Sequence, residues 1–232
     1  MKKFGILIFI AAIILGIFVS SFFSIGPAAK PSFSFSFNKT TKGSGNVSTE
    51  ARDIRDFTGV DVSGVFQVEI TAQKDFAVEI EADDNLIPLI KTEVRGGVLH
   101  IETEDRLSTD NGLKVRIHAP DIDDIDASGA AKINATAISN EQLQVHTSGA
   151  SKISLSGETA NLSVDVSGAS RIEAENLKAE NAEVDASGAS SVSVFAAGEL
   201  RTDLSGASKV VYSGSPKNIY KKTSGASSVK EK

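Results

Sequence analysis

From residue 56 onward, apolar and polar side chains alternate along most of the chain with the period of two that is typical of β-strands. In the C-terminal half this alternation recurs around a three-residue unit, Ser-Gly-Ala, whose six copies are spaced by 20, 19, 20, 18 and 19 residues. The copies are Ser128-Gly129-Ala130, Ser148-Gly149-Ala150, Ser167-Gly168-Ala169, Ser187-Gly188-Ala189, Ser205-Gly206-Ala207 and Ser224-Gly225-Ala226. A period this constant indicates stacked supersecondary units rather than one closed core.

Each repeat predicts two strands joined by a corner. Apolar or β-branched residues recur five, three and one positions before most of the serines, and again five and seven positions after most of them. We expect these side chains to point inward. The glycine is explained by a bend that requires a φ closed to other residues, and the alanine by a methyl group inside a narrow coil. The pattern therefore predicts an all-β fold, a parallel β-helix of about 19–20 residues per coil, built from residues 121–232.

Residues 47–120 are expected to form a β-rich cap at the N-terminal end of this stack. Alternation predicts half-buried strands at Val60, Val62, Val65, Val68, Ile70, Phe76, Val78 and Ile80. Residues 84–90 have the acidic start and the proline of a short helix, and Gly96-Gly97 predicts a two-residue hairpin turn. Ser63-Gly64-Val65 is interpreted as a degenerate first copy of the triplet.

The N-terminus predicts export. Residues 1–3 carry two lysines, and residues 4–23 form an uncharged, mostly apolar stretch long enough to span a bilayer as a helix. The lysines favour a cytoplasmic N-terminus, with everything after the stretch outside the cytoplasm. The segment is either a retained anchor, which places the domain on the outer side of the inner membrane, or a cleaved signal, which releases it to the periplasm or cell surface. Residues 24–46 are expected to be a linker.

Charge and composition exclude several functional classes. After residue 23 the chain has 22 basic and 30 acidic side chains, a formal charge of −8. This argues against a nucleic-acid partner, because such binding depends on clustered lysine and arginine. The chain has no cysteine, which excludes disulfides and thiolate chemistry.

Two outward rows are the only candidate chemistry in the repeats. Two residues before the serine lie Asp126, His146, Asp165, Asp185, Asp203 and Lys222, and four residues after it lie Lys132, Lys152, Arg171 and Lys209. The aspartates favour either a solvated surface that the basic row neutralises, or a row that binds a cation such as calcium or a glycan. We assign no catalytic residue, no cofactor and no defined metal site.

The opening strands, Glu81-Ala82-Asp83-Asp84-Asn85-Leu86, Thr92-Glu93-Val94 with Gly97-Val98-Leu99, and the serial Ser-Gly-Ala-Ser-Lys-Ile motifs together resemble the bacterial head GIN domain family of autotransporter adhesin heads. The resemblance covers the chain from about residue 47 onward. It implies a right-handed β-helix shaped like pectin-lyase-like proteins, with a role in adhesion and no catalytic residues. The chain departs from the Gly-Ile-Asn signature, since its corners read Gly-Ala and only Ile133-Asn134 keeps the last two residues.

These observations favour a non-catalytic binding module of the cell surface or envelope. Its expected partners are the membrane, through residues 4–23 if they are retained, and glycans or surface proteins. Two alternatives remain, a polysaccharide-processing enzyme and a structural protein that associates with itself as a homo-oligomer.

Overall fold

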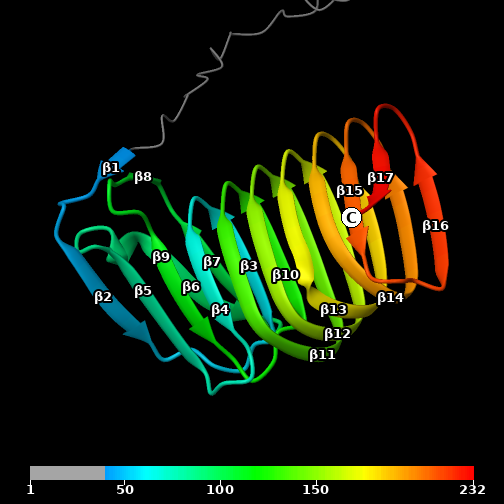
Figure 1. Cartoon of the computed structure of the whole chain (residues 1–232). Helices are drawn as coiled ribbons and strands as arrows, with labels where there is room; N and C mark the ends of the chain where they lie inside the picture. The colour runs from blue at the N-terminus through cyan, green and yellow to red at the C-terminus, as the bar shows by residue number, and fades with distance from the viewer. Residues whose placement is uncertain (1–39) are drawn as a thin grey trace, which may run out of the picture. The chain divides into compact units, whose positions relative to one another are not determined.

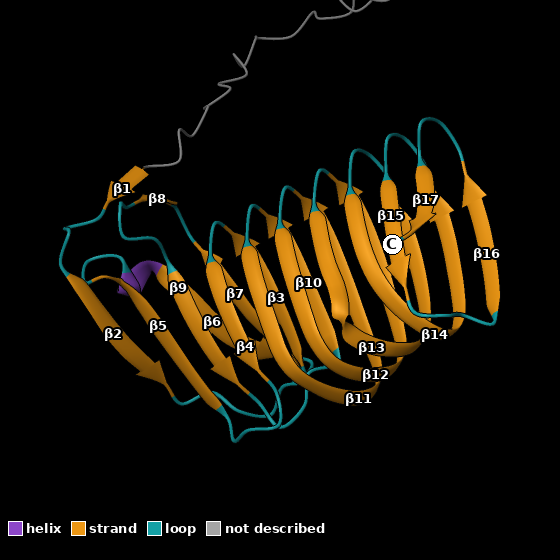
Figure 2. Cartoon of the chain, viewed as in Figure 1, coloured by secondary structure: helices purple, strands orange, loops and turns teal. Residues whose placement is uncertain are grey.

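The computed structural model describes residues 40–232, and the expected hydrophobic helix at residues 4–23 lies outside them. The described residues are almost entirely β-structure (Figure 2). The N-terminal elements are β1 (Thr40–Lys42), β2 (Val47–Arg52), β3 (Gly59–Gly64), β4 (Gln67–Thr71), β5 (Ala77–Asp83), the 3₁₀ turn η1 (Ile87–Leu89), β6 (Ile90–Arg95), β7 (Val98–Thr103), β8 (Arg106–Ser108) and β9 (Lys114–His118). The repeats follow as β10 (Asp124–Gly129), β11 (Lys132–Gly149), β12 (Lys152–Gly168), β13 (Arg171–Ala186), β14 (Ser191–Leu204), β15 (Lys209–Ser213), β16 (Asn218–Thr223) and β17 (Ser228–Glu231).

The repeats form a parallel β-solenoid, as the spacing predicts (Figure 1). Each strand from β10 to β14 pairs in parallel with the next, and β14 then pairs with β15 and β16. The strands are longer than expected, because the return segment of each coil continues as β-structure into the next coil. Register shifts fall within these return segments, for example between Ala135 and Ile138, so they absorb the variation in repeat length.

The interior is filled by the predicted inward positions. The column that contains Leu143, Leu162, Ala182 and Leu200 is buried, and so is the column that contains Ile133, Ile153, Ile172 and Val192. Because equivalent strands stack in register, each apolar side chain packs on its counterpart in the next coil. At the last coil the first of these columns becomes exposed at Ile219, which is 40% exposed, whereas the second ends at the partly buried Val229.

The N-terminal part contributes to the stack itself. β3 pairs in parallel with β10 and aligns Ser63 with Ser128 and Gly64 with Gly129, which confirms the degenerate first copy. β4 pairs in parallel with β11. β7 and β9 lie on the other side of β3 and β4, so this coil sits inside the stack although it comes early in the sequence.

Some of the local predictions for residues 47–120 are confirmed, and one is wrong. β6 and β7 form the expected hairpin, with positive φ at both Gly96 and Gly97, and the short helix is a single 3₁₀ turn. The prediction for Val65 is wrong, because Val65 stands at the corner and is 71% exposed. At the end of the expected linker, β1 pairs with β8.

The buried Asp83 ties these N-terminal loops together. Its two carboxylate oxygens accept hydrogen bonds from Thr109 Oγ1 at 2.6 Å and Asn111 Nδ2 at 2.7 Å. These bonds, with the Thr109 bond the largest contribution, hold the pKa of Asp83 below its ordinary value. Within residues 40–232, no helix is long and apolar enough to cross a membrane.

Candidate functional site

The six triplets stack into one column of corners, as the repeat predicts. Ser128, Ser148 and Ser167 are in register, and the alanine N–H of each later corner donates to the glycine carbonyl of the coil before it, as Ala189 does to Gly168 at 2.8 Å. Each glycine of the triplets has a positive φ, between 73° and 122°. A Cβ on Gly168 would lie 2.5 Å from the carbonyl oxygen of Gly149, so the glycine serves both the bend and the close approach of successive coils.

The interpretation of the triplet alanines is wrong. Every one of them is exposed, and the small side chains inside the corner belong to the next residue along the chain. This interior column comprises Ala131, Ser151, Ser170, Ser190, Ser208 and the partly exposed Ser227. The alanine faces outward because the chain has already turned at the glycine, so the following residue is the first to point back inside.

The interior serines form hydrogen bonds from coil to coil, and we call them the serine ladder. Ser151 N donates to Ser170 Oγ at 3.1 Å, and Ser190 Oγ donates to Ser208 Oγ at 3.1 Å. Sequence reasoning missed this ladder, although its signal was present: a small residue follows the triplet in all six copies.

The predicted aspartates stand in one outward column on the strands that precede the corner. Asp126, His146, Asp165, Asp185 and Asp203 are neighbours in register. The column extends beyond the prediction, because Asp61 aligns with Asp126 and His100 with Asp61. We call Asp61, Asp126, His146, Asp165, Asp185 and Asp203 the aspartate column. A basic residue adjoins it at each end: His100 Nδ1 lies 2.8 Å from Asp61 Oδ2, and Lys222 Nζ lies 2.5 Å from Asp203 Oδ2.

Burial, and after it the charge of neighbouring carboxylates, shifts the pKa of two members of this column. Burial raises the pKa of Asp126, and the neighbouring charge of Asp61 adds to the effect. Burial also raises the pKa of Asp185, with further contributions from Glu183 and Asp203. Both carboxyl groups therefore accept a proton more readily than an isolated aspartate.

Within the described part of the chain, the basic row does not pair directly with the aspartate column. Lys132, Lys152, Arg171 and Lys209 lie beyond the corner, and within residues 40–232 none of them makes an ion pair with the aspartate column. Lys152 pairs instead with Glu173 at 2.7 Å, because the outward directions diverge where the chain turns at the glycine. Nor do the described residues bring three or more histidine, aspartate or glutamate side chains close enough to hold a metal ion.

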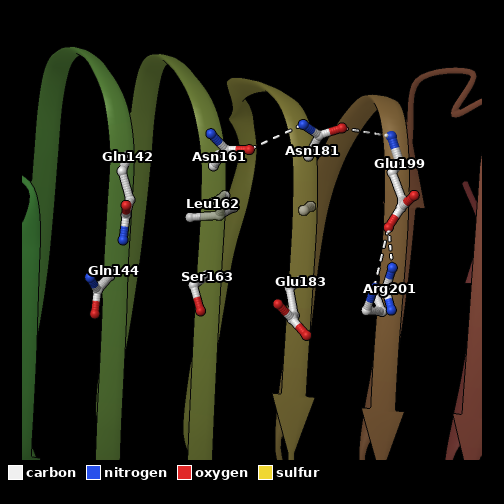
Figure 3. A pocket seen from close by; sticks show the side chains of 10 residues that line it. Gln142, Gln144, Asn161, Leu162, Ser163, Asn181, Glu183, Glu199 and Arg201 are labelled. Atoms are coloured by element: carbon white, nitrogen blue, oxygen red, sulfur yellow. Dashed lines mark hydrogen bonds and ion pairs between the residues drawn. The ribbon is translucent and has the colours of Figure 1, made fainter.

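The same strands carry two further outward columns, which border a groove (Figure 3). Six residues before the serine lie Gln142, Asn161, Asn181 and Glu199, which we call the amide column. Four residues before it lie Gln144, Ser163, Glu183 and Arg201, which we call the mixed column. The groove has a volume of about 730 Å³ and crosses four coils.

Hydrogen bonds along the amide column hold part of this groove in place. Asn181 Nδ2 donates to Asn161 Oδ1 at 3.1 Å, and the backbone N–H of Glu199 donates to Asn181 Oδ1 at 3.1 Å. Glu199 Oε1 then accepts from Arg201 at 2.6 Å (Figure 3). Sequence reasoning missed both columns, although a polar side chain six residues before five of the six serines was a readable signal for the amide column.

A second, adjoining groove of about 530 Å³ shares Glu183 and Arg201 with the first and reaches the last coil. Tyr220 lines it, follows Arg201 in register, and is 51% exposed. The guanidinium carbon of Arg201 lies 4.9 Å from the centre of the Tyr220 ring. The face thus combines amides, a serine hydroxyl, compensated charges and an exposed aromatic ring.

The chain belongs to the family described as "Putative auto-transporter adhesin, head GIN domain", whose model matches residues 56–216. A comparison with curated proteins found no match. The fold is similar to the crystal structure of a "putative adhesin" from Bacteroides fragilis NCTC 9343, with 19% sequence identity, 82% of this chain and 99% of that chain covered, and a TM-score of 0.68. A "putative lipid binding protein" from Parabacteroides distasonis ATCC 8503 shares 20% identity over 83% of this chain and 99% of its own, with a TM-score of 0.50. At these identities the likeness shows a shared fold.

Proposed function

We propose that this head GIN family member is an exported, membrane-anchored binding module without catalytic activity. Export and anchoring rest on residues 1–23, where two lysines precede an apolar stretch of bilayer-spanning length. The family and the Bacteroides fragilis neighbour both carry the description "putative adhesin", which supports a role at the cell surface.

The observation that carries the binding role is the groove across four coils of a rigid stack. Its side chains come from strands in register, so their spacing is fixed by the backbone at about 4.8 Å per coil. Such a surface presents a repeating set of hydrogen-bonding groups without the cost of ordering loops on binding.

The composition of the groove supports binding rather than turnover. Its ionisable groups are Glu183, Glu199 and Arg201, and Glu199 is already engaged with Arg201 at 2.6 Å. Hydrolysis of a glycosidic bond typically uses two carboxyl groups in different protonation states, placed on either side of that bond. With Glu199 paired to Arg201, Glu183 is the one carboxylate of the described groove lining left over, and the amides and the serine do not supply a second titratable group.

The test is to screen the full-length chain, purified in detergent, against arrays of glycans and extracellular matrix proteins, and to analyse each captured ligand for breakdown products. We expect binding to at least one array member without product formation. Degradation of a bound polymer would replace the proposal with an enzymatic function, and an absence of binding to both arrays would overturn it. Export is tested separately, by whether protease added to intact cells or spheroplasts degrades residues 40–232.

A further inference from the structure

We propose that the groove between the amide column and the mixed column is the binding site for a neutral, linear glycan. The inference rests on the proposed binding function and adds to it a site and a chemical class of ligand. It is drawn from the lining side chains, their free hydrogen-bonding groups and the charge around them.

Three of the lining residues are free to bind a ligand. The side chains of Gln142, Gln144 and Ser163 make no hydrogen bond within residues 40–232, and both glutamines are exposed. Each amide offers two N–H donors and a carbonyl acceptor, and the serine hydroxyl both donates and accepts. Neighbouring hydroxyl groups of a sugar also donate and accept, so they match these side chains without requiring a charge on either partner.

The fixed part of the groove lies beside this free part. Asn161 and Asn181 are joined to each other and to Glu199 by hydrogen bonds, so the wall that they form is already in place before a ligand arrives. A preformed wall favours affinity because fewer side chains lose rotamer freedom on binding.

Local charge selects a neutral ligand over an acidic one. Glu183 lines the groove and the aspartate column runs alongside it, while Arg201 is paired with Glu199. The whole chain also has a formal net charge of −6. A polyuronate would therefore bring like charges onto this face, whereas a neutral glycan would not.

The direction and the end of the groove fit an extended chain. The groove crosses coils one after another, so the same kinds of group recur along the stack axis at about 4.8 Å. Beyond its C-terminal end, in the adjoining groove that shares Glu183 and Arg201, the half-exposed Tyr220 ring gives an apolar surface on which the C–H face of a sugar ring can pack. A linear glycan can use both features at once.

The experiment titrates the full-length chain in detergent with linear hexasaccharides of glucose and of N-acetylglucosamine, in both α- and β-linked forms where available, and with polygalacturonate as the acidic comparison. The test variant is Gln142→Ala combined with Gln144→Ala. The two glutamine side chains that it removes are exposed and make no hydrogen bond within residues 40–232, so the fold is retained. The matched control is Asn134→Ala, which removes an exposed amide from the opposite side of the corner.

We expect a neutral hexasaccharide to bind, the glutamine variant to weaken its Kd by about tenfold through the loss of two amide contacts, and the control to match the parent. Equal binding by parent and glutamine variant would place the ligand elsewhere and overturn the inference, while leaving the proposed function intact. Binding of polygalacturonate or a matrix protein alone would have the same consequence. Failure of every hexasaccharide and every array member would overturn the inference and the proposed function together.

Discussion

At the scale of single residues, the corner column shows why glycine and alanine have different importance in the same triplet. Gly168 has a φ of 104°, and its backbone lies against Gly149 of the preceding coil. Ala169 is exposed, and Val65 occupies the equivalent position of the first corner with 71% of its surface exposed. The glycine is therefore fixed by geometry, whereas the alanine position already accommodates a larger side chain.

Replacing this glycine tests the argument. Gly168→Ala should lower the free energy of unfolding by about 2–5 kcal/mol, because strain at positive φ adds to a Cβ contact of 2.5 Å with backbone. The measurement is urea denaturation followed by far-UV circular dichroism. Ala169→Val is the control and should change stability by no more than about 0.5 kcal/mol. A large loss in the control would restore the interpretation that the alanine methyl lies inside the coil.

The aspartate column sets a second residue-scale property, its response to pH. Because burial and the charge of Asp61 raise the pKa of Asp126, the folded protein holds a proton on this group at pH values where the unfolded chain has lost it. The stabilising contribution is therefore complete below the ordinary aspartate pKa of 3.8 and disappears as the pH rises through the folded value.

Asp126→Asn should accordingly stabilise the protein at pH 7, by about 0.2–1 kcal/mol for relief of like charges on neighbouring strands. The advantage should vanish near pH 3, where the parent aspartate is itself neutral. Urea unfolding at the two pH values measures both effects, and Glu158→Gln, an exposed change in a return segment, serves as the comparison. A variant less stable than the parent at pH 7 would mean that the ionised Asp126 makes a favourable contact.

At the scale of the coil, hydrogen bonds inside the corner complement those of the strands. The strands before and after each triplet pair through their backbones, and this ladder continues through the alanine N–H but is interrupted at the next residue, where the N–H of Ser151 donates to no backbone carbonyl within residues 40–232. The serine ladder supplies partners at this interruption, as when Ser170 Oγ accepts the backbone N–H of Ser151. A buried N–H without a partner costs free energy, so the residue that follows each triplet has a structural reason to be serine.

Ser170→Ala should therefore lower the free energy of unfolding by about 1–3 kcal/mol, the cost of leaving the buried Ser151 N–H without an acceptor. Thermal and urea denaturation provide the measurement. Ser167→Ala makes the same chemical change at the same corner. Ser167 is the exposed first residue of the triplet that precedes Ser170, and its side chain makes no hydrogen bond within residues 40–232. Equal losses in the two variants would contradict a special role for the interior serine.

The elements differed in how far they could be predicted from the sequence. Periodicity was sufficient for the stack, the glycine corners and the Gly96-Gly97 hairpin, because inward side chains and positive φ leave direct marks on residue type. It was insufficient for the residue after the triplet, since serine is common both inside and outside a bend. The position of the β3–β4 coil within the stack depends on pairing with β7 and β9, which no local pattern encodes.

The candidate site also contains one part that the sequence predicted and one that it did not. The aspartate column was predicted residue by residue, because a fixed offset from the triplet implies a shared column. The groove was missed because its amides are ordinary surface residues until their place in the groove lining and their hydrogen bonds are known. The lack of direct pairing between the basic row and the aspartates depends on the angle of the corner, which the repeat alone does not specify.

At the scale of the whole molecule, the last described coil leaves two strand edges open. The outer edges of β16 and β17 are unpaired within residues 40–232, which is the arrangement that invites another strand to add. The inward column that contains Val164, Val184 and Thr202 continues into Lys221, whose Nζ lies 5.0 Å from the centre of the Tyr212 ring. An inward-facing charge at an open edge opposes further stacking, because an added coil would bury it without a partner.

Lys221→Val should therefore convert this end into an apolar edge and promote association. Light scattering coupled to size exclusion, applied to residues 40–232 over a tenfold range of concentration, should show a mass that rises with concentration for the variant only. Lys217→Val removes the same charge from an exposed position before β16 and should behave as the parent. If Lys221→Val stays at the parent mass, the lysine is not what limits the stack. A parent that already associates would instead show that the charge is tolerated in an interface and would favour the self-associating alternative.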